Sequence, residues 1–579
     1  MTLNRHKLTS GITQAFTGHR GRDLKETLTA YLFLAPALIL IFLFGIFPVG
    51  FALYVSFHKW LIVRGDFLGL ANYVSAVDEF AYIGLFVLAV GCFAGAFAWG
   101  RKLAMEINQR KATLWWLAIP GALFAGSLFA FLRWLFFQLP EFLDIADKMR
   151  GQERTQELFF RLLSEAFHAE TVYPLWVQFV TILTAALIVS YASRKVLPSQ
   201  DNLKLQVRFS SVFLALGIGV GLLNFNFQAI NQAYAVALQT GEDPGIWPQV
   251  IMVMSGVLLL LLAWRIWKNA EKSSTPIRFG LHLLASIMLM VGAVMLIIEI
   301  PTIVAMGDED LWNGLKVTVF FSIGTVPVQL AIALFLSVLL FQKLKGSAFF
   351  RVVYFLPYVT PAVAAATIFR LLFSERESAP ANTALHWLGV QPQEWLRQAE
   401  GIFSMLANGL GISGYPEALI PKWFPLELGQ LLVNWLTGPS QALLVVIMLS
   451  VWTFVGYNVV IYLAGLSNIP AEITEAAEID GGNKWDVFRH ITFPLLSPTT
   501  YFLSLIAVIG TFKAFNTMWV MRLGESLGTI DTISIVIFDE FFNRTRYGYA
   551  SALAFVLFAI ILTLTLINNR VQGSRVFYG

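Results

Sequence analysis

The chain has 579 residues, of which 57% are hydrophobic and only 13% are charged, and its mean hydropathy is +0.68. Soluble globular domains usually carry about 25% charged residues, so this composition excludes a soluble protein and indicates an integral membrane protein. The net charge of +4 is small, and the single cysteine, Cys92, excludes a disulfide framework and argues against a metal cluster.

Twelve apolar segments are long enough to cross a bilayer, since about 20 mostly apolar residues span its hydrocarbon core. The first of them is too long for the apolar region of a cleavable signal peptide, so we expect it to remain in the protein. In chain order, the predicted spans are 31–57, 81–99, 114–138, 171–193, 209–228, 248–264, 279–305, 315–341, 352–373, 441–466, 498–520 and 547–567.

Lysine and arginine are concentrated in alternate loops between these spans. The loops that contain Arg101, Lys204 and Arg265 are rich in both residues, whereas the loop 229–247 contains neither. Cytoplasmic loops of membrane proteins are enriched in Lys and Arg. This alternation therefore predicts that both termini and the loop 468–498 are cytoplasmic.

The cytoplasmic loop contains the stretch "EAAEIDGGNKWDVFRHITFPLLSP" (475–498). Pro470 favours the first turn of a helix, with Ser467 or Asn468 as its cap, and Gly481-Gly482 should end that helix. A second helix, "NKWDVFRHI", should end before Pro494. The pattern predicts two short amphipathic helices at the cytoplasmic surface, which either bind a cytoplasmic protein or rest on lipid.

The spacing of particular residues in this loop favours the first alternative. Glu475-Ala476-Ala477, three residues, Gly481, nine residues, Ile491 and then Pro494 resemble the EAA loop of ABC-importer permeases, with Phe493 at a position where that family usually has Leu. In that family the loop binds the ATP-binding subunits. The resemblance implies that coupling residues here are Glu475, Ala476, Ala477, Asp480, Gly481, Trp485, Phe488, Ile491 and Pro494.

Further stretches resemble carbohydrate-type permeases, specifically the larger membrane subunit of maltose importers and its glycerol-phosphate relatives. They are 35–60, 67–73 ("FLGLANY"), 311–340, 350–373 and 547–570. The resemblance implies an all-α integral membrane protein. We expect about 12 transmembrane helices: a six-span type I ABC-importer permease core and an inserted six-helix block.

The limits of the spans and of the stretches that resemble permeases predict a domain organisation. The segments are a cytoplasmic N-terminal segment 1–30, a first core span with a periplasmic segment 31–79, the inserted block 80–308, core spans 309–373, a periplasmic loop 374–440, and core spans 441–579 with the coupling loop 468–498. Within the insert, the glycines of 216–223 indicate helix packing, and the amphipathic segment 139–170 either lies on the membrane surface or contacts a periplasmic partner. The long loop 374–440 is a candidate contact for the substrate-binding protein.

The spans on either side of the coupling loop carry polar and aromatic residues that are costly in lipid unless they face protein or a water-filled passage. Sugars are bound by such hydrogen-bonding groups and rings, so we expect the substrate passage here, although the same residues could instead bridge helices. Lys513 either meets an anionic substrate, extends to the interface or forms an ion pair. The candidate passage residues are Trp452, Tyr457, Asn458, Thr511, Phe512, Phe515 and Asn516.

The resemblance implies a permease subunit that passes a sugar, such as an oligosaccharide or a maltose-like glycoside, from a periplasmic binding protein into the cytoplasm. The sequence has no phosphate-binding G-x-x-x-x-G-K-[ST] motif, so no catalytic residue, metal or cofactor is expected in this chain; ATP and magnesium would bind a partner. Expected partners are a pair of ATP-binding subunits, a second permease subunit, the binding protein and the lipid of a bacterial or archaeal inner membrane, and no nucleic acid. The alternatives are an ion-coupled secondary transporter with twelve spans, an ABC permease for a non-sugar solute, and a membrane enzyme.

Overall fold

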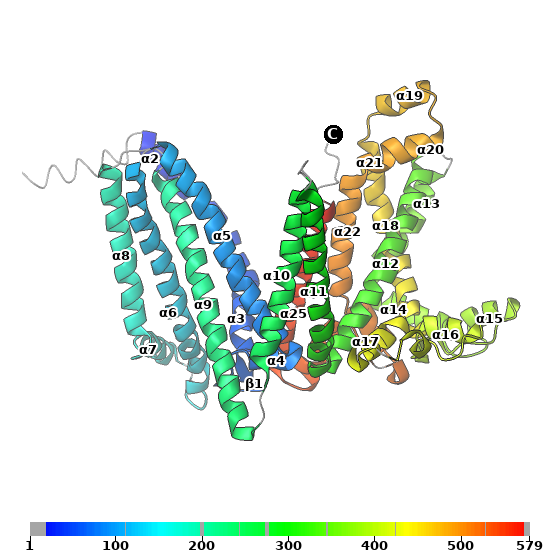
Figure 1. Cartoon of the computed structure of the whole chain (residues 1–579), viewed down its shortest axis with the longest axis horizontal. Helices are drawn as coiled ribbons and strands as arrows, with labels where there is room; N and C mark the ends of the chain where they lie inside the picture. The colour runs from blue at the N-terminus through cyan, green and yellow to red at the C-terminus, as the bar shows by residue number, and fades with distance from the viewer. Residues whose placement is uncertain are drawn as a thin grey trace, which may run out of the picture. The chain divides into compact units, whose positions relative to one another are not determined.

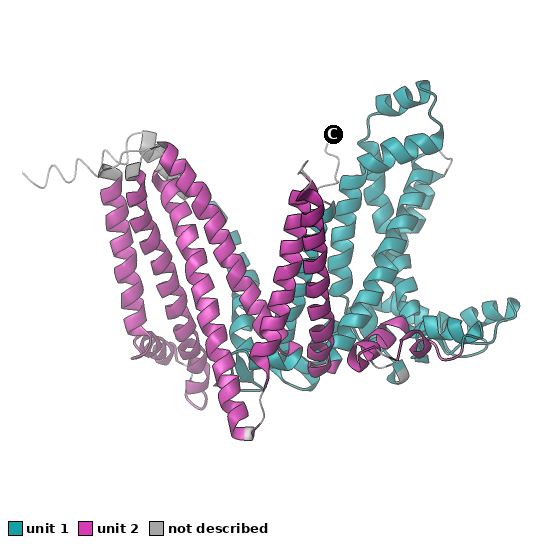
Figure 2. Ribbon diagram, viewed as in Figure 1, with its two compact units in different colours: residues 1–76, 310–412, 437–579 teal, residues 77–309, 413–436 magenta. Residues whose placement is uncertain are grey.

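In the computed structural model, the residues described are 19–110, 112–153, 155–196, 202–241, 244–271, 277–342, 346–422, 424–526 and 528–572. Most of the predicted N-terminal segment 1–30 lies outside them. The regular secondary structure of the described residues is helical apart from one antiparallel hairpin, β1 (His58–Trp60) and β2 (Arg64–Phe67), and an isolated bridge between Gly401 and Ser440. It divides into two compact units (Figure 2): unit 1 comprises residues 1–76, 310–412 and 437–579, and unit 2 comprises 77–309 and 413–436.

Ten helical segments in the described chain are long and apolar enough to cross a membrane, or up to twelve if two bent helix pairs each count as one span. Each of the twelve predicted spans overlaps one of these ten segments or one of the two bent pairs. The ten are Thr29–Ser56, Phe80–Gln109, Leu114–Lys148, Tyr173–Ser193, Asn202–Gln239, Ile246–Glu271, Ile277–Met306, Glu309–Phe341, Gln441–Ser467 and Tyr547–Val571, and the bent pairs are Ser347–Val359 with Ala362–Leu372 and Lys484–Leu495 with Ser497–Phe512.

Unit 1 contains the first and the last helices of the chain (Figure 1). Its longer elements are α2 (His19–Ile41), η1 (Phe42–Ile46), α3 (Phe47–Ser56), α4 (Ala71–Val77), α12 (Glu309–Phe341), α13 (Ser347–Val359), α14 (Ala362–Leu372), α18 (Gln441–Ser467), α22 (Ser497–Phe512) and α25 (Tyr547–Gln572). Its shorter helices are α15 (Pro380–Trp387), η3 (Trp395–Arg397), α16 (Ile402–Gly409), α19 (Ala471–Ile479), α20 (Lys484–Val487), η5 (Phe488–Thr492), α21 (Phe493–Leu495), α23 (Asn516–Met521), η6 (Gly524–Ser526), α24 (Ile533–Phe538) and η7 (Asp539–Asn543).

The predicted span 352–373 is not one straight helix. α13 and α14 meet at an angle of 95°, at Thr360 and Pro361. Proline has no backbone N–H and disfavours helical backbone in the residue before it, and Thr360 accordingly adopts an extended conformation with ψ 133°. The bend therefore lies at the Thr-Pro step, although a proline in an apolar segment does not always break a helix here, since Pro140, Pro301 and Pro327 lie inside α6 (Ala118–Lys148), α11 (Ile277–Met306) and α12.

The buried residues of helix α18 belong to two hydrophobic clusters among the described residues of unit 1. The helix packs against α13 at Gly456. A Cβ atom on Gly456 would lie 1.8 Å from the carbonyl oxygen of Tyr354. The two backbones can therefore approach this closely only because residue 456 has no side chain.

The motif "FLGLANY" stabilises the turn that follows the first span. The Nδ2 of Asn72 donates to the carbonyl oxygens of Ser56 at 2.8 Å and His58 at 3.0 Å. Helix α25 packs on α3 and β1, and a Cβ on Gly548 would lie 2.2 Å from the His58 carbonyl oxygen. Asn72 thus connects the end of α3 to the hairpin against which the last span packs.

Unit 2 contains a bundle of four long helices, α5 (Phe80–Arg110), α6 (Ala118–Lys148), α8 (Tyr173–Val196) and α9 (Asn202–Thr240), and a pair formed by α10 (Ile246–Glu271) and α11 (Ile277–Met306). Its shorter elements are η2 (Ala112–Leu117), α7 (Gln156–Phe167), η4 (Glu417–Leu419) and α17 (Leu426–Leu436), of which α17 packs on α11. A Cβ on Gly217 would lie 2.4 Å from the Phe129 ring and one on Gly219 3.0 Å from the Phe93 ring, whereas nothing lies within 4 Å of one on Gly221. The predicted packing role of the 216–223 glycines is therefore confirmed for Gly217 and Gly219 but not for Gly221.

The predicted amphipathic segment 139–170 forms the end of α6 and the helix α7. Leu162 of α7 is buried against Ile145 of α6, and the Phe167 ring lies 5.5 Å from that of Trp176. The apolar face of α7 therefore packs mainly on its own unit, while Phe159 and Phe160 remain exposed.

Candidate coupling loop and solute passage

Two short helices form the predicted coupling loop. α19 ends at Ile479, and Gly481 follows with φ +87°, a left-handed conformation that glycine adopts without strain. The Gly481 and Gly482 N–H groups donate to the carbonyl oxygens of Glu478 at 3.1 Å and Ala477 at 2.9 Å. The prediction that Gly481-Gly482 ends the first helix is confirmed.

The second helix begins with a reciprocal cap that our sequence reasoning did not identify. The Asn483 Oδ1 accepts from the backbone N–H groups of Trp485 at 2.9 Å and Asp486 at 3.0 Å, while the Asp486 Oδ2 accepts from the Asn483 N–H at 3.1 Å. The spacing of an N-cap residue and an acid three positions later is the signal that could have revealed it. This capping box stabilises the turn between the two helices.

Two details of the predicted loop are wrong. The N-cap of α19 is Pro470 without a side-chain hydrogen bond, and the Ser467 hydroxyl donates instead to the Leu463 carbonyl within α18. Pro494 does not end the second helix, because α20 continues through the π-helical segment η5 into α21, and Pro494 lies near the end of the continuous stretch Lys484–Leu495. A π-helical segment changes the backbone hydrogen bonding to an i→i+5 pattern, and Pro494, which has no N–H, lies just after it.

The coupling loop lies beyond the ends of α18 and α22 in unit 1 (Figure 1). Ile479 is 86% exposed and Trp485 is 62% exposed, and both belong to the loop's apolar surface. Ile479 was not among the predicted coupling residues. Of those residues other than Trp485, the exposed ones are Glu475, Ala476, Asp480 and Gly481, and the half-buried ones are Ala477, Phe488, Ile491 and Pro494. Such exposed large apolar side chains outside the apolar spans are a feature of protein-binding surfaces.

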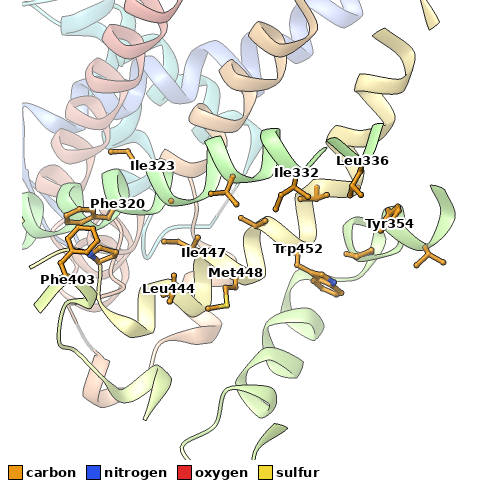
Figure 3. A pocket seen from close by; sticks show the side chains of 18 residues that line it. Phe320, Ile323, Ile332, Leu336, Tyr354, Phe403, Leu444, Ile447, Met448 and Trp452 are labelled. Carbon is orange, nitrogen blue, oxygen red and sulfur yellow. The ribbon is translucent and has the colours of Figure 1, made fainter. Parts of the chain in front are cut away.

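An apolar cavity of about 960 Å³ lies between α12, α13 and α18 (Figure 3). It extends along α12 from Phe320 to Leu336, and Tyr354 of α13 and Trp452 of α18 line it from other sides. Sixteen residues of α-helix correspond to about 24 Å, which is most of the bilayer's hydrocarbon thickness. Among the predicted passage residues, Trp452 lines this cavity.

The predicted residues on α18 point in different directions. The ring of Tyr457 stacks on Tyr358 of α13, with ring centres 4.9 Å apart. Asn458 is buried, and its Nδ2 has no hydrogen-bond partner in the described part of the chain. An unpaired buried amide is costly, so Asn458 offers a free hydrogen-bond donor on this helix, while the Oε1 of Gln441, at the start of the same helix, is also without a partner among the described residues.

The residues after the coupling loop surround the end of α22. Thr511 is buried and its hydroxyl lies 2.9 Å from that of Ser322 on α12, and Phe512 is also buried. The chain then leaves the helix, so that the Phe515 ring lies 4.8 Å from Phe538 and Asn516 is exposed. The structure therefore does not collect all seven predicted residues around one cavity.

Lys513 is exposed at the C-terminal end of α22, where a cation interacts favourably with the helix dipole. No hydrogen bond or ion pair of its ammonium group occurs within the described residues. No group of three or more His, Cys, Asp or Glu side chains placed to hold a metal was found among the described residues either.

A charged network near the last span was not anticipated from the sequence. The Arg522 guanidinium donates to Asp531 at 3.0 Å and Asp539 at 2.9 Å. Glu540 is buried and accepts from Arg544 at 2.6 Å and Arg546 at 2.6 Å. The signal was the run of paired charges between 522 and 546, which the span prediction treated as an ordinary loop.

The chain shares its permease domain with known proteins. Residues 329–575 match the family model "Binding-protein-dependent transport system inner membrane component". The arabinooligosaccharides transport system permease protein AraP of Bacillus subtilis is 31% identical over 46% of this chain and 71% of its own length. The chain belongs to this family.

Other similarities extend to about the same part of this permease. The lactose transport system permease protein LacF of Rhizobium radiobacter is 28% identical over 46% of this chain and 78% of its own length. A solved bacterial alginate ABC transporter in complex with an alginate-pentasaccharide-bound periplasmic protein aligns over 54% of this chain and 99% of that chain, with 18% identity and a TM-score of 0.37.

Family membership confirms the predicted class. The protein is a multi-pass inner membrane permease subunit of a binding-protein-dependent ABC importer, with the permease domain in its C-terminal half. It is a transport subunit and not an enzyme. The alternatives of a secondary transporter and a membrane enzyme are therefore wrong.

Proposed function

We propose that this permease passes a sugar, and in particular an oligosaccharide, from a periplasmic binding protein into the cytoplasm. ATP hydrolysis on a separate pair of subunits, which bind ATP and magnesium, drives the transport, and a second permease subunit completes the passage. The proposal is supported by relatives whose names specify arabinooligosaccharide and lactose transport. An ABC permease for a non-sugar solute is the alternative.

The exposed coupling loop is the observation that best supports this mechanism. We infer that Ile479 and Trp485 insert into a groove of the ATP-binding subunit, and that Glu475 orients the contact. The turn at Gly481 sets the angle between α19 and α20, so movement of the partner is transmitted through η5 and α21 into α22. The 60° bend between that segment and α22 lets the loop lie across the helix ends while α22 crosses the membrane.

The topology that fits this role has both termini and the coupling loop in the cytoplasm. We propose that six spans of unit 1 form the transport core and that the predicted insert 80–308 adds six spans. An even number of inserted spans keeps the coupling loop on the same side as the N-terminus. The division of the chain near residues 76 and 310 is consistent with such an insertion.

We propose that the solute passes along α18 and the joint between α22 and α23. Trp452 and Asn516 are exposed, Tyr457 and Phe515 are half-buried, and Asn458 is buried. Aromatic rings there would pack on the apolar faces of sugar rings, while Asn458 and Asn516 would hydrogen-bond hydroxyl groups. In this arrangement the buried residues Thr511 and Phe512 position the surface and do not touch the solute.

On the opposite side, the loop 374–440 is our candidate for the contact with the binding protein. A polar pocket of about 440 Å³ there is lined by Arg370, Arg376 and Arg397, together with Glu375 and Glu394. Arg397 and Glu375 form an ion pair at 2.6 Å. We propose that unpaired charge in this pocket orients the docking binding protein, because charged surfaces steer association.

The decisive experiment is co-purification of the tagged permease with its co-expressed ATP-binding subunit. Gly481→Asp should abolish retention of that subunit and solute-stimulated ATPase activity, because a side chain at φ +87° strains the turn. Gly411→Asp is a matched control, since Gly411 has φ +77° in the loop predicted to be periplasmic. Equal retention of the ATP-binding subunit by the two variants would contradict the coupling role. Uptake of sugars by the wild-type transporter, measured separately, would distinguish a sugar permease from a permease for a non-sugar solute.

A further inference from the structure

A cleft in unit 2, with both charged and apolar side chains in its lining, lies between helices α5 and α9. It has a volume of about 460 Å³ and is lined by Trp99, Lys102, Leu103 and Glu106 of α5 and by Arg208, Ser211 and Val212 of α9. The two helices pack against each other along their length. Neither the family match, which begins at residue 329, nor the coupling loop involves this cleft.

The depth of the cleft corresponds to the headgroup layer of the membrane. α5 begins at Phe80, and the 20 residues from Phe80 to Trp99 extend about 30 Å, which is the thickness of the hydrocarbon core. The residues from Trp99 to Glu106 then lie at the headgroup layer on the side that the proposed topology makes cytoplasmic. Trp115 lies at the same end, with its Nε1 donating to Asn108 at 3.4 Å and its ring 5.9 Å from that of Phe209, as tryptophans do at membrane interfaces.

The charges of the cleft are positive in sum. Arg208 donates to Glu106, which leaves the Lys102 ammonium as the uncompensated charge. In the described part of the chain, no hydrogen bond or ion pair of Lys102 is found, and its side chain is exposed. The Ser211 hydroxyl, which donates to the Val207 carbonyl, retains lone pairs and stands beside Arg208 in the lining.

An apolar surface continues from the cleft toward the membrane centre. Trp99 is 54% exposed, and Leu88, three helical turns earlier on the same face of α5, is 60% exposed. A ligand that fills this site therefore needs an anionic group at the level of Lys102 and an apolar chain that lies along α5. A basic pocket between membrane helices on the cytoplasmic side is the arrangement that binds anionic lipid headgroups.

We propose that this cleft binds an anionic phospholipid, with its phosphate between Lys102 and Arg208 and one acyl chain along Trp99 and Leu88. The site would attach the inserted unit to the cytoplasmic leaflet. This inference rests on the proposed topology for its side of the membrane, but not on the identity of the transported solute.

The test is lipid binding to the purified full chain in detergent, measured by native mass spectrometry and by thermal unfolding with added phosphatidylglycerol or phosphatidylcholine. Lys102→Gln should weaken phosphatidylglycerol binding about fivefold, since one lysine at a membrane surface contributes about 1 kcal/mol. Arg101→Gln is the matched control: it removes the same charge from the neighbouring exposed residue, which does not line the cleft. Trp99→Ala is a second variant that should also weaken binding without altering charge.

Equal binding of the two lipids by the wild type, or equal losses in Lys102→Gln and Arg101→Gln, would overturn the proposal. If millimolar inorganic phosphate stabilises the chain as much as the lipid does, the site binds a free phosphate group and the lipid assignment is wrong. If Lys102→Gln loses the ATP-binding subunit and keeps its lipid, the cleft is a protein contact. Because lipid binding is measured without transport, failure here leaves the proposed importer function unaffected.

Discussion

The crossing of α13 and α18 at Gly456 leads to our most specific prediction, that Gly456→Ala destabilises the transport core. A Cβ at this position would lie 1.8 Å from the Tyr354 carbonyl oxygen and 3.0 Å from the Phe355 Cα, so backbone atoms must move. Atoms of this kind normally stay more than 3 Å apart, and the helices would therefore have to separate by about an ångström. Overpacking of this type costs roughly 1–3 kcal/mol, and the rigid contact with backbone places this variant at the upper end.

The measurement is the unfolding temperature of the purified chain in detergent. One kcal/mol shifts this temperature by about 2–4 °C in domains of 150–250 residues, so we expect a decrease of several degrees. Gly510→Ala in α22 is the control, because nothing lies within 4 Å of its added Cβ and alanine favours a helix by about 1 kcal/mol. Unchanged unfolding of Gly456→Ala, or an equal change in both variants, would refute the close approach of the two helices.

Three further predictions concern other parts of the chain. Asn72→Ala removes both hydrogen bonds to the Ser56 and His58 carbonyls and should lower the unfolding temperature, at a cost of about 1–3 kcal/mol; an unchanged value would show that the turn does not depend on Asn72. Asn483→Ala removes the capping box, worth about 1 kcal/mol, and should weaken retention of the ATP-binding subunit without unfolding the core; wild-type retention would contradict this. Burial and the neighbouring charges of Asp78 and Glu299 raise the pKa of Glu79 from its ordinary value to about 7. Because this folded-state pKa lies above the unfolded one, the folded state should lose stability as the pH rises through about 7. Glu79→Gln should remove this pH dependence of the unfolding temperature.

Local properties of the sequence were enough to predict the spans and the two short helices of the candidate coupling loop with the turn between them. A long apolar segment crosses the membrane wherever it occurs, and the left-handed turn at Gly481 follows from the glycine itself. The same reasoning identified Gly217 and Gly219 correctly as packing residues, but not Gly221. It failed at Pro494, because a helix can continue past a proline where the preceding backbone is π-helical, and the sequence pattern did not predict that segment.

The tertiary structure alone decided which residues meet. Gly456 lies opposite the Tyr354 carbonyl and Thr511 opposite Ser322, although 102 and 189 positions respectively separate these partners along the chain. The candidate passage residues form two short groups in the sequence, 452–458 and 511–516. Within each group, some side chains are buried and others exposed, depending on which helix packs over them. The apolar pattern of the sequence predicts which segments cross the membrane. Because nearly every face of these helices is apolar, the pattern does not predict which face packs on protein and which faces lipid.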